Sequence, residues 1–202
     1  MTVRGHFIVF EGVDGCGKTT QVRRVAAARS ALATFEPGDT ELGASLRTVV
    51  LDPSVSMTAL VEMLVMAADR AQHVTQLIEP TLASGRDVVC DRFSGSTLAY
   101  QGYGRGVDLE DVRRVVEVAA GGLRPDVTVL LDCPPEVARA RRGARAGPAD
   151  RFEASDAAFA TRVRDGFRSL AAATPGWCVV DAARPLATVS REVDAAIEAV
   201  LS

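Results

Sequence analysis

Short apolar runs alternate along the chain with longer stretches in which apolar residues recur every three or four positions. The clearest runs, at 6–10, 88–90 and 126–132, are rich in Val, Ile, Leu and Phe, as strands buried on both faces of a parallel sheet are. Two weaker strand signals lie at 31–35 and 177–180. Strands that alternate with helices predict an α/β fold in which right-handed crossovers build one parallel sheet.

The helical stretches are bounded by residues that cap or break helices. Thr40 and Asp108 can each accept a hydrogen bond from the first turn of a helix, and Pro134-Pro135 can open another. The Gly-rich segment 94–106 predicts a connection between regular elements. A cluster of polar residues interrupts the middle of the longest stretch, and its histidine, His73, is expected to be a surface or structural residue without a catalytic role. The predicted helices span 19–32, 40–51, 57–84, 108–120, 155–173 and 186–201, with a further helix beginning at 134–135.

Residues 12–19 read G-V-D-G-C-G-K-T, which matches the phosphate-loop pattern G-x-x-x-x-G-K-[ST]. The loop follows a predicted strand and opens a predicted helix, and this context argues against a chance glycine-rich turn. Its backbone N–H groups would surround a polyphosphate at a helix N-terminus, and Thr19 would offer a hydroxyl to Mg²⁺. Lys18 is the only lysine among 23 basic residues, and it stands where a compact ammonium is needed. The residues predicted to bind the nucleotide are Gly12, Asp14, Gly15, Cys16, Gly17, Lys18, Thr19 and Thr20.

Composition narrows the class of protein. Apolar residues make up 48% of the 202-residue chain, and charged residues make up 24%, as in a globular enzyme. The net charge of −3 provides no basic field for nucleic acid, and no apolar run approaches the ~18 residues of a membrane span. The four cysteines form no C-x-x-C pair, and the N-terminus has no signal-peptide pattern. We expect a single cytoplasmic domain over 1–202 with free thiols.

Two further features favour phosphoryl transfer. Asp91 and Arg92 follow a buried strand, and ligands bind at the carboxyl ends of parallel strands. The segment 139–151 is rich in arginine and interrupted by glycine, which suits a lid that closes on phosphate but also fits a solvated basic helix face. A GTPase is excluded, because the chain contains no Asn for a guanine-reading N-K-x-D motif.

Several blocks of the sequence resemble the thymidylate kinase family of the bacterial type. The resemblance covers nearly the whole chain and implies a P-loop NTPase fold with a five-stranded parallel sheet flanked by helices, and an arginine-rich lid near 141–152. It also implies a homodimer with the helix at 57–84 as a contact, and transfer of phosphate from ATP to dTMP with Mg²⁺. The blocks that carry it are F-E-G-V-D-G-C-G-K-T-T (10–20), E-P-G-D-T (36–40), A-A-D-R-A-Q-H (67–73), D-R-F-S-G-S-T-L-A-Y-Q-G-Y-G-R-G (91–106), R-P-D-V-T-V-L-L-D (124–132) and D-R-F-E (150–153).

The resemblance also implies roles for individual residues. Asp14 would lie near the acceptor's sugar and phosphate, Asp91 would support the metal with Thr19, and Tyr100 would pack under the sugar and disfavour a 2′-hydroxyl. Arg70 would bind a thymine carbonyl, with Thr97 and Gln101 reading the rest of the base edge. The implied catalytic residues are Lys18, Arg92, Asp14, Arg142, Arg145 and Arg151. The implied acceptor residues are Glu36, Arg47, Met66, Arg70, Arg92, Ser96, Thr97, Tyr100 and Gln101.

Structural alternatives exist for some of these side chains. Arg70 could pair with Asp69 or Glu62 along one helix face, which would contribute only a few tenths of a kcal/mol. Tyr100 could be a plain core residue, and Gln101 could cap a turn.

The chain departs from the family pattern at three positions of the acceptor site. Phe35 stands where the family commonly has an arginine for the acceptor phosphate, and Asp39 replaces a glycine. Met66 stands where the family commonly places a phenylalanine against the base. These changes leave two alternatives open: a kinase of the same fold that acts on another pyrimidine or modified deoxynucleotide, and a nucleotide-binding protein with little transfer activity.

Overall fold

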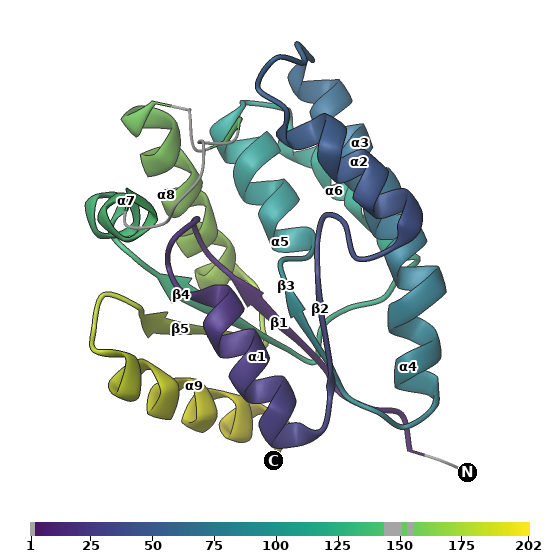
Figure 1. Cartoon of the computed structure of the whole chain (residues 1–202), viewed down its shortest axis with the longest axis vertical. Coiled ribbons are helices and arrows are strands. Elements are labelled where there is room, and N and C mark those ends of the chain that lie inside the picture. Colours follow the sequence, from purple (N-terminus) through teal and green to yellow (C-terminus); the bar gives the residue numbers. More distant parts are fainter. Residues whose placement is uncertain (1–2, 144–150, 153–155) are drawn as a thin grey trace.

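The computed structural model describes residues 3–143, 151–152 and 156–202. Its centre is a parallel sheet of five strands in the order β2-β3-β1-β4-β5 (Figure 1). The sheet confirms the predicted α/β fold, and each strand falls within a residue or two of its predicted position. The strands are β1 (Phe7–Glu11), β2 (Leu32–Phe35), β3 (Val88–Asp91), β4 (Val127–Asp132) and β5 (Trp177–Asp181).

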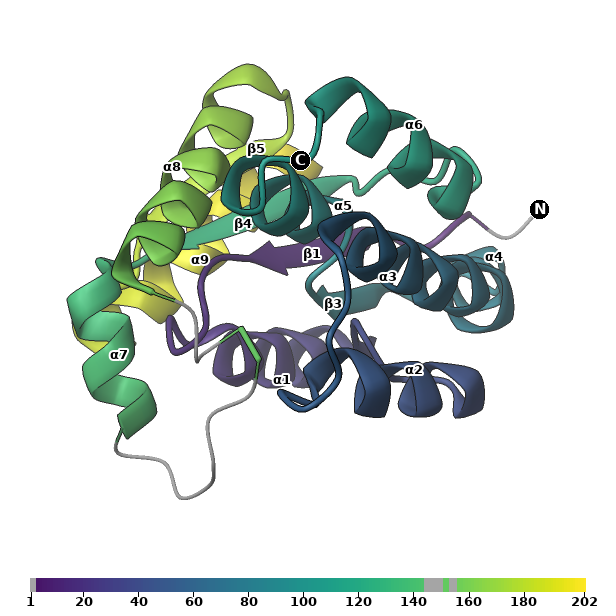
Figure 2. The same ribbon diagram turned by 90° about the horizontal axis from the view of Figure 1, so that it is seen from above.

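Helices cover both faces of this sheet. Figure 2 shows α1 on one face and α5 and α6 on the other. Helix α9 packs beside α1, where Arg24 and Asp194 form an ion pair of 2.7 Å. The helices are α1 (Lys18–Arg29), α2 (Glu41–Leu51), α3 (Ala59–His73), α4 (Glu79–Ala83), α5 (Ser94–Thr97), α6 (Leu109–Ala120), α7 (Pro135–Gly143), α8 (Ala157–Ala173) and α9 (Leu186–Leu201), with π-helical segments η1 (Val74–Ile78) and η2 (Leu98–Gly104).

Side chains cap helices where the sequence predicts them. The Thr40 hydroxyl accepts the N–H of Gly43 at 2.9 Å and starts α2. The Asp108 carboxylate accepts the N–H of Glu110 at 2.9 Å and starts α6. Each cap satisfies an amide that has no partner within its own helix.

The polar residues in the long helical stretch do not interrupt it. The stretch continues from α3 through η1 into α4, and Asp69, Arg70 and His73 are buried rather than exposed. The expectation that His73 is a surface residue is therefore wrong, and the alternative of a structural residue fits. The reason is tertiary: Glu36, distant in sequence, provides a buried partner for both Arg70 and His73.

Segment 94–106 is largely helical, contrary to the prediction of a connection. It forms α5 and η2, which follow each other without a break. Two of its glycines serve close packing. A Cβ at Gly95 would lie 2.7 Å from the Trp177 ring, and one at Gly104 would lie 2.7 Å from the Phe159 ring. The glycines thus let α8 and β5 approach this segment closely.

The cysteines and the lengths of the helices can be compared with the sequence in the same way. All four cysteines are free, as predicted, and burial raises the pKa of the Cys16 and Cys133 thiols. Among the described residues, no helix is long and apolar enough to span a bilayer.

Candidate active site

The phosphate loop occupies the predicted position between β1 and α1. Gly17 precedes the first residue of α1 and has a φ of 101°, in the left-handed region that favours glycine. Gly15 has a φ of 87°, and a Cβ there would lie 2.4 Å from the carbonyl oxygen of Ala138. The loop therefore needs its glycines, and it places the N-terminus of a helix where an anion would be stabilised.

Lys18 folds back into the loop and is 5% exposed. Its Nζ donates to the carbonyl oxygens of Gly12 at 3.0 Å and Val13 at 3.1 Å, and it lies 4.0 Å from Asp14 Oδ1. Arg142 of α7 reaches the same loop, since its Nη1 donates to the Asp14 carbonyl oxygen at 2.9 Å. Two predicted phosphate-binding cations thus meet at the loop.

Asp14, Arg92 and Tyr100 form one cluster beside the loop. Arg92 Nη2 donates to Asp14 Oδ1 at 2.7 Å, and the Tyr100 hydroxyl donates to Asp14 Oδ2 at 3.2 Å. The guanidinium also lies over the Tyr100 ring, 5.0 Å from its centroid. Burial alone would raise the pKa of Asp14, but Arg92 and Lys18 outweigh it and hold that pKa below its usual range. Burial raises the pKa of Tyr100, so its hydroxyl remains a donor.

The two residues predicted to hold Mg²⁺ are in direct contact. The Thr19 hydroxyl donates to Asp91 Oδ2 at 2.7 Å, because β3 lies beside β1 and brings its carboxyl end next to the loop. A hydroxyl and a carboxylate are the hard oxygen ligands that Mg²⁺ prefers. Within the part of the chain that the structure describes, no three His, Cys, Asp or Glu side chains cluster as a cage for a metal. This arrangement suits a cation that takes its other ligands from phosphate and water.

A small pocket of about 80 Å³ opens next to this cluster. It contains eight of the predicted site residues together with Pro37, Leu51 and Phe152, to which the sequence analysis assigned no role. Phe152 belongs to a block that carries the family resemblance, and that was its only sequence signal. The predicted residues that line the pocket are Asp14, Glu36, Arg47, Met66, Arg92, Ser96, Tyr100 and Gln101.

Arg70 and Thr97 lie behind the wall of this pocket. Arg70 Nη2 is 2.8 Å from Glu36 Oε2, and its Nη1 donates to Thr97 Oγ1 at 3.0 Å. His73 reaches the same Glu36 carboxylate, with Nδ1 3.0 Å from Oε1. The alternative in which Arg70 pairs with a carboxylate on its own helix face is wrong, since Glu36 on a separate segment is its partner.

The residues that depart from the family pattern have specific surroundings. Phe35 is 38% exposed, and the guanidinium of Arg47 lies 5.6 Å from its ring centroid. Arg47 Nη1 also donates to the Pro37 carbonyl oxygen at 2.6 Å, which places a cation at the wall of the pocket. The Asp39 carboxylate accepts a hydrogen bond of 2.5 Å from Thr34, and Asp39 does not line the pocket. The added negative charge is therefore engaged outside the pocket.

The predicted arginines of the lid have different locations. Arg142 contacts the phosphate loop, as described above. Arg151 donates to the carbonyl oxygens of Val55 at 3.0 Å and Met57 at 2.9 Å, between α2 and α3. Arg145, with most of the predicted lid, lies outside the described residues. The structure also shows a buried carboxylate that the sequence analysis did not select, Glu62 of α3, 3.5 Å from Arg151.

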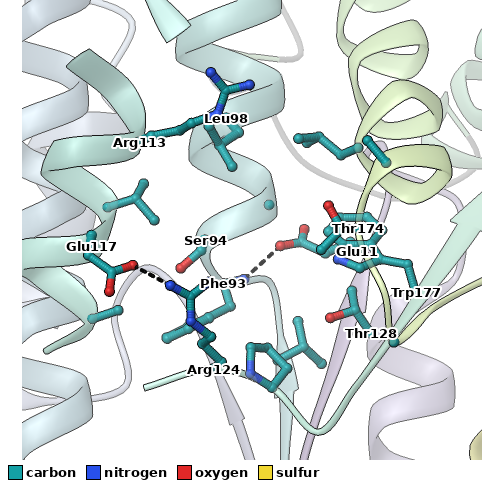
Figure 3. Close-up of a pocket in the computed structure, with 18 of the residues that line it drawn as sticks. Glu11, Phe93, Ser94, Leu98, Arg113, Glu117, Arg124, Thr128, Thr174 and Trp177 are labelled. Atoms are coloured by element: carbon teal, nitrogen blue, oxygen red, sulfur yellow. Dashed lines mark hydrogen bonds and ion pairs between the residues drawn. The ribbon is translucent and has the colours of Figure 1, made fainter. Parts of the chain in front are cut away.

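A second, larger cavity of about 1020 Å³ lies between α6 and α8 (Figure 3). Glu11 forms part of its wall and accepts the N–H of Phe93 at 3.0 Å, and an ion pair of 3.0 Å joins Arg124 and Glu117. No residue from 12 to 19 lines it. The larger cavity therefore lacks the phosphate-binding groups that surround the smaller pocket.

Comparison with known proteins agrees with this geometry. The thymidylate kinase family model matches residues 10–193. A thymidylate kinase from Synechococcus sp. is 47% identical over 211 residues, which cover 92% of this chain and 99% of its own. One from Deinococcus radiodurans is 45% identical over 200 residues, covering 96% and 97% of the two chains. The crystal structure of thymidylate kinase from Ehrlichia chaffeensis is similar with a TM-score of 0.77 and 31% identity, covering 96% of this chain and 99% of that one.

The similar sequences span nearly the whole chain, and the similar structure has the same extent. The phosphate loop, the Asp14–Arg92 pair and the adjacent pocket lie within the matched residues. The chain belongs to the thymidylate kinase family, whose members are nucleoside monophosphate kinases.

Proposed function

We propose that this chain transfers the γ-phosphoryl group of ATP to dTMP, giving ADP and dTDP. The observation that carries the proposal is the contact between Arg92 and Asp14, 2.7 Å long, which joins the phosphate loop to the acceptor pocket. A cation at that junction lies between the donor and acceptor phosphates, where negative charge must be neutralised during transfer.

The donor side consists of the loop, Lys18 and Arg142. Loop amides at the N-terminus of α1 would bind donor phosphates, and Lys18 would exchange its two carbonyl partners for a phosphate oxygen. Thr19 and Asp91 would hold Mg²⁺, which supplies further charge neutralisation to the phosphates when bound. Arg145 and Arg151 complete the proposed set of arginines, and Arg151 would leave the carbonyl oxygens of Val55 and Met57 to reach the transferred group.

The acceptor side consists of the small pocket. Met66 would cover one face of the base, and Tyr100 would lie under the sugar, where its ring leaves little room for a 2′-hydroxyl. Gln101 would read the base edge directly, while Arg70 and Thr97 would act from behind the wall. Arg47 beside Phe35 provides a cation for the acceptor phosphate at the place where the family commonly has an arginine.

These positions bear on the two alternatives. Phe35, Asp39 and Met66 were the features that favoured another acceptor. Arg47 lies over Phe35 and Asp39 is bonded to Thr34, while Met66 lines the pocket. The contacts of Arg47 and Asp39 support binding of the acceptor phosphate, and the family supports dTMP as the acceptor. The contacts of Lys18, Thr19, Asp91 and Arg92 favour transfer over simple nucleotide binding.

Product analysis tests the proposal. Incubation with ATP labelled at the γ-phosphate, Mg²⁺ and dTMP should give labelled dTDP. The Lys18→Ala variant should give almost none, which excludes a contaminating kinase. Labelled inorganic phosphate without dTDP would contradict the proposal, because it would show hydrolysis in place of transfer.

We also propose that the active protein is a cytoplasmic homodimer that contacts its partner through α3. Leu60, Val61 and Leu64 on this helix are 54%, 45% and 48% exposed, and Leu42 of the adjacent α2 is 47% exposed. Exposed apolar side chains of this kind would be covered by a second copy. Sedimentation should show a dimer for the wild type and a monomer for Leu64→Glu.

The cytoplasmic location is supported by the four cysteines. They are free thiols, as is usual for proteins in a reducing compartment.

A further inference from the structure

Glu62 is a carboxylate in α3 with 0% exposure, and the mechanism above does not use it. Its Oε1 accepts from Gln101 Nε2 at 2.9 Å and from Arg105 Nε at 3.3 Å. Its Oε2 accepts from Arg105 Nη2 at 3.3 Å and lies 3.5 Å from Arg151 Nε. Two arginines thus face this buried carboxylate.

The carboxylate determines which way the Gln101 amide faces. Both Glu62 oxygens accept hydrogen bonds from Arg105, and the NH₂ group of Gln101 faces Oε1 as a further donor. The other end of the amide, Oε1, is buried and has no hydrogen-bond partner within the described part of the chain. Gln101 itself is 1% exposed and lines the acceptor pocket. A buried acceptor without a partner is rare in folded proteins, and beside the acceptor pocket this one is available to a ligand.

We infer that Glu62 is a positioning residue that sets base specificity by presenting Gln101 Oε1 to the pocket as an acceptor. This inference rests on the proposed function and deepens it. The acceptor selects a base whose ring edge presents an N–H donor, which thymine and uracil have at N3. Cytosine has a lone pair and no proton at N3. Its N3 and Gln101 Oε1 would both be acceptors, so no hydrogen bond could form between them.

The Glu62 carboxylate also lies near Arg151, a residue of the predicted lid. Arg151 Nη1 donates to the Val55 carbonyl oxygen at 3.0 Å, and the N–H of Arg151 donates to the Leu51 carbonyl oxygen at 3.2 Å. Phe152 follows Arg151 in the chain and lines the acceptor pocket. Glu62 therefore contacts Gln101, which would read the base. It also contacts Arg151, whose neighbour Phe152 lines the pocket.

The direct test is Glu62→Gln, which keeps the size of the side chain but allows it to donate as well as accept. The side-chain amide of Gln101 can then rotate so that its oxygen faces position 62, and Oε1 is no longer held toward the pocket. We expect the ratio of kcat/KM for dTMP over dCMP to fall by about tenfold or more, mainly through a higher KM for dTMP, with the KM for ATP unchanged. Glu62→Asp, which still only accepts, should retain more of the selectivity. Glu117→Gln on the exposed face of α6 is the matched control and should leave the ratio unchanged.

A folded Glu62→Gln variant that loses activity equally toward both substrates would overturn the inference and leave only a structural role. If the wild type fails to phosphorylate dTMP, the proposed function itself fails, so the two failures are distinguishable. A second measurement needs no Glu62 variant. The side-chain NH₂ of Gln101, assigned by its loss in Gln101→Met, should exchange slowly with solvent in the free enzyme. Fast exchange would overturn the inference, because it would show that Glu62 does not hold the amide.

Discussion

Arg92 Nη2 lies 2.7 Å from Asp14 Oδ1, and this ion pair joins the carboxyl end of β3 to the phosphate loop. The Asp14 carboxylate is ionised, and it fixes a guanidinium whose side chain is only 12% exposed. Asp14→Asn would weaken this bond and leave Arg92 free to change its direction. We expect kcat/KM for dTMP to fall by about a hundredfold, because positioning and charge neutralisation are most of the catalysis in phosphoryl transfer.

Steady-state kinetics of Asp14→Asn should be compared with Asp111→Asn, which changes an exposed carboxylate on α6. The control should keep its activity. A variant at Asp14 with activity within threefold of the wild type would show that the ion pair does not organise the site.

Lys18 should not be replaceable by arginine. Its Nζ fits between the carbonyl oxygens of Gly12 and Val13 as a compact ammonium with 5% exposure. The planar guanidinium of Lys18→Arg is larger and has a fixed fork geometry, so it cannot occupy the same space. We expect kcat to fall by about 10²-fold or more. Full activity of Lys18→Arg would contradict the role given to this ammonium.

Ser96 should position Arg92 for catalysis. Arg92 Nη1 donates to Ser96 Oγ at 2.7 Å, and Ser96 Oγ donates to the buried carboxylate of Glu11 at 2.6 Å. Burial raises the pKa of Glu11, while Arg92 partly offsets this effect. Ser96→Ala removes the link between Glu11 and Arg92, and we expect about a tenfold lower kcat with an unchanged KM for ATP.

The matched control for this change is Ser169→Ala, because Ser169 lines the larger cavity between α6 and α8. It should leave kcat unchanged. Equal losses in the two variants would contradict the assignment of the active site to the smaller pocket.

Asp69 should make the protein less stable at neutral pH. Burial, and then the negative charge of Glu36, raise the pKa of Asp69 to about 6. Asp69 therefore binds a proton more tightly in the folded state than in the unfolded state. Its contribution to the free energy of unfolding falls as the pH rises from about 4 to about 6. Asp69 Oδ1 accepts the N–H of Gly38 at 3.0 Å, while Oδ2 is buried without a hydrogen-bond partner among the described residues.

Asp69→Asn keeps the acceptor and removes the charge. We expect the free energy of unfolding of this variant to be about 1–2 kcal/mol higher than that of the wild type at pH 8. At pH 4 the two values should be nearly equal. Urea titrations of both proteins at the two pH values measure this. A variant that is less stable than the wild type at pH 8 would contradict the account.

The strands and the phosphate loop could be predicted because their signals are local. The run from Phe7 to Phe10 is fully buried, and the loop motif lies between that run and a helix. The caps at Thr40 and Asp108 depend on hydrogen bonds to residues two or three positions away. Such features can be read from a few adjacent residues.

The rest depends on partners that are distant in sequence. Arg70 is buried with Glu36 opposite it, and the glycines of segment 94–106 lie against Trp177 and Phe159. Glu62 was not selected because nothing in its own segment shows that Gln101 and two arginines surround it. The contact between Arg47 and Phe35 likewise forms only once the chain has folded.

The most direct test of the central claim is ADP release by the wild-type protein with ATP, Mg²⁺ and a panel of acceptors. The panel is dTMP, dUMP, dCMP, UMP, CMP and dGMP, each titrated to saturation. The account predicts the highest kcat/KM with dTMP, a lower value with the ribonucleotide UMP because of Tyr100, and low values with both cytosine nucleotides. A higher kcat/KM with any other member of the panel, or no turnover with dTMP, would contradict it.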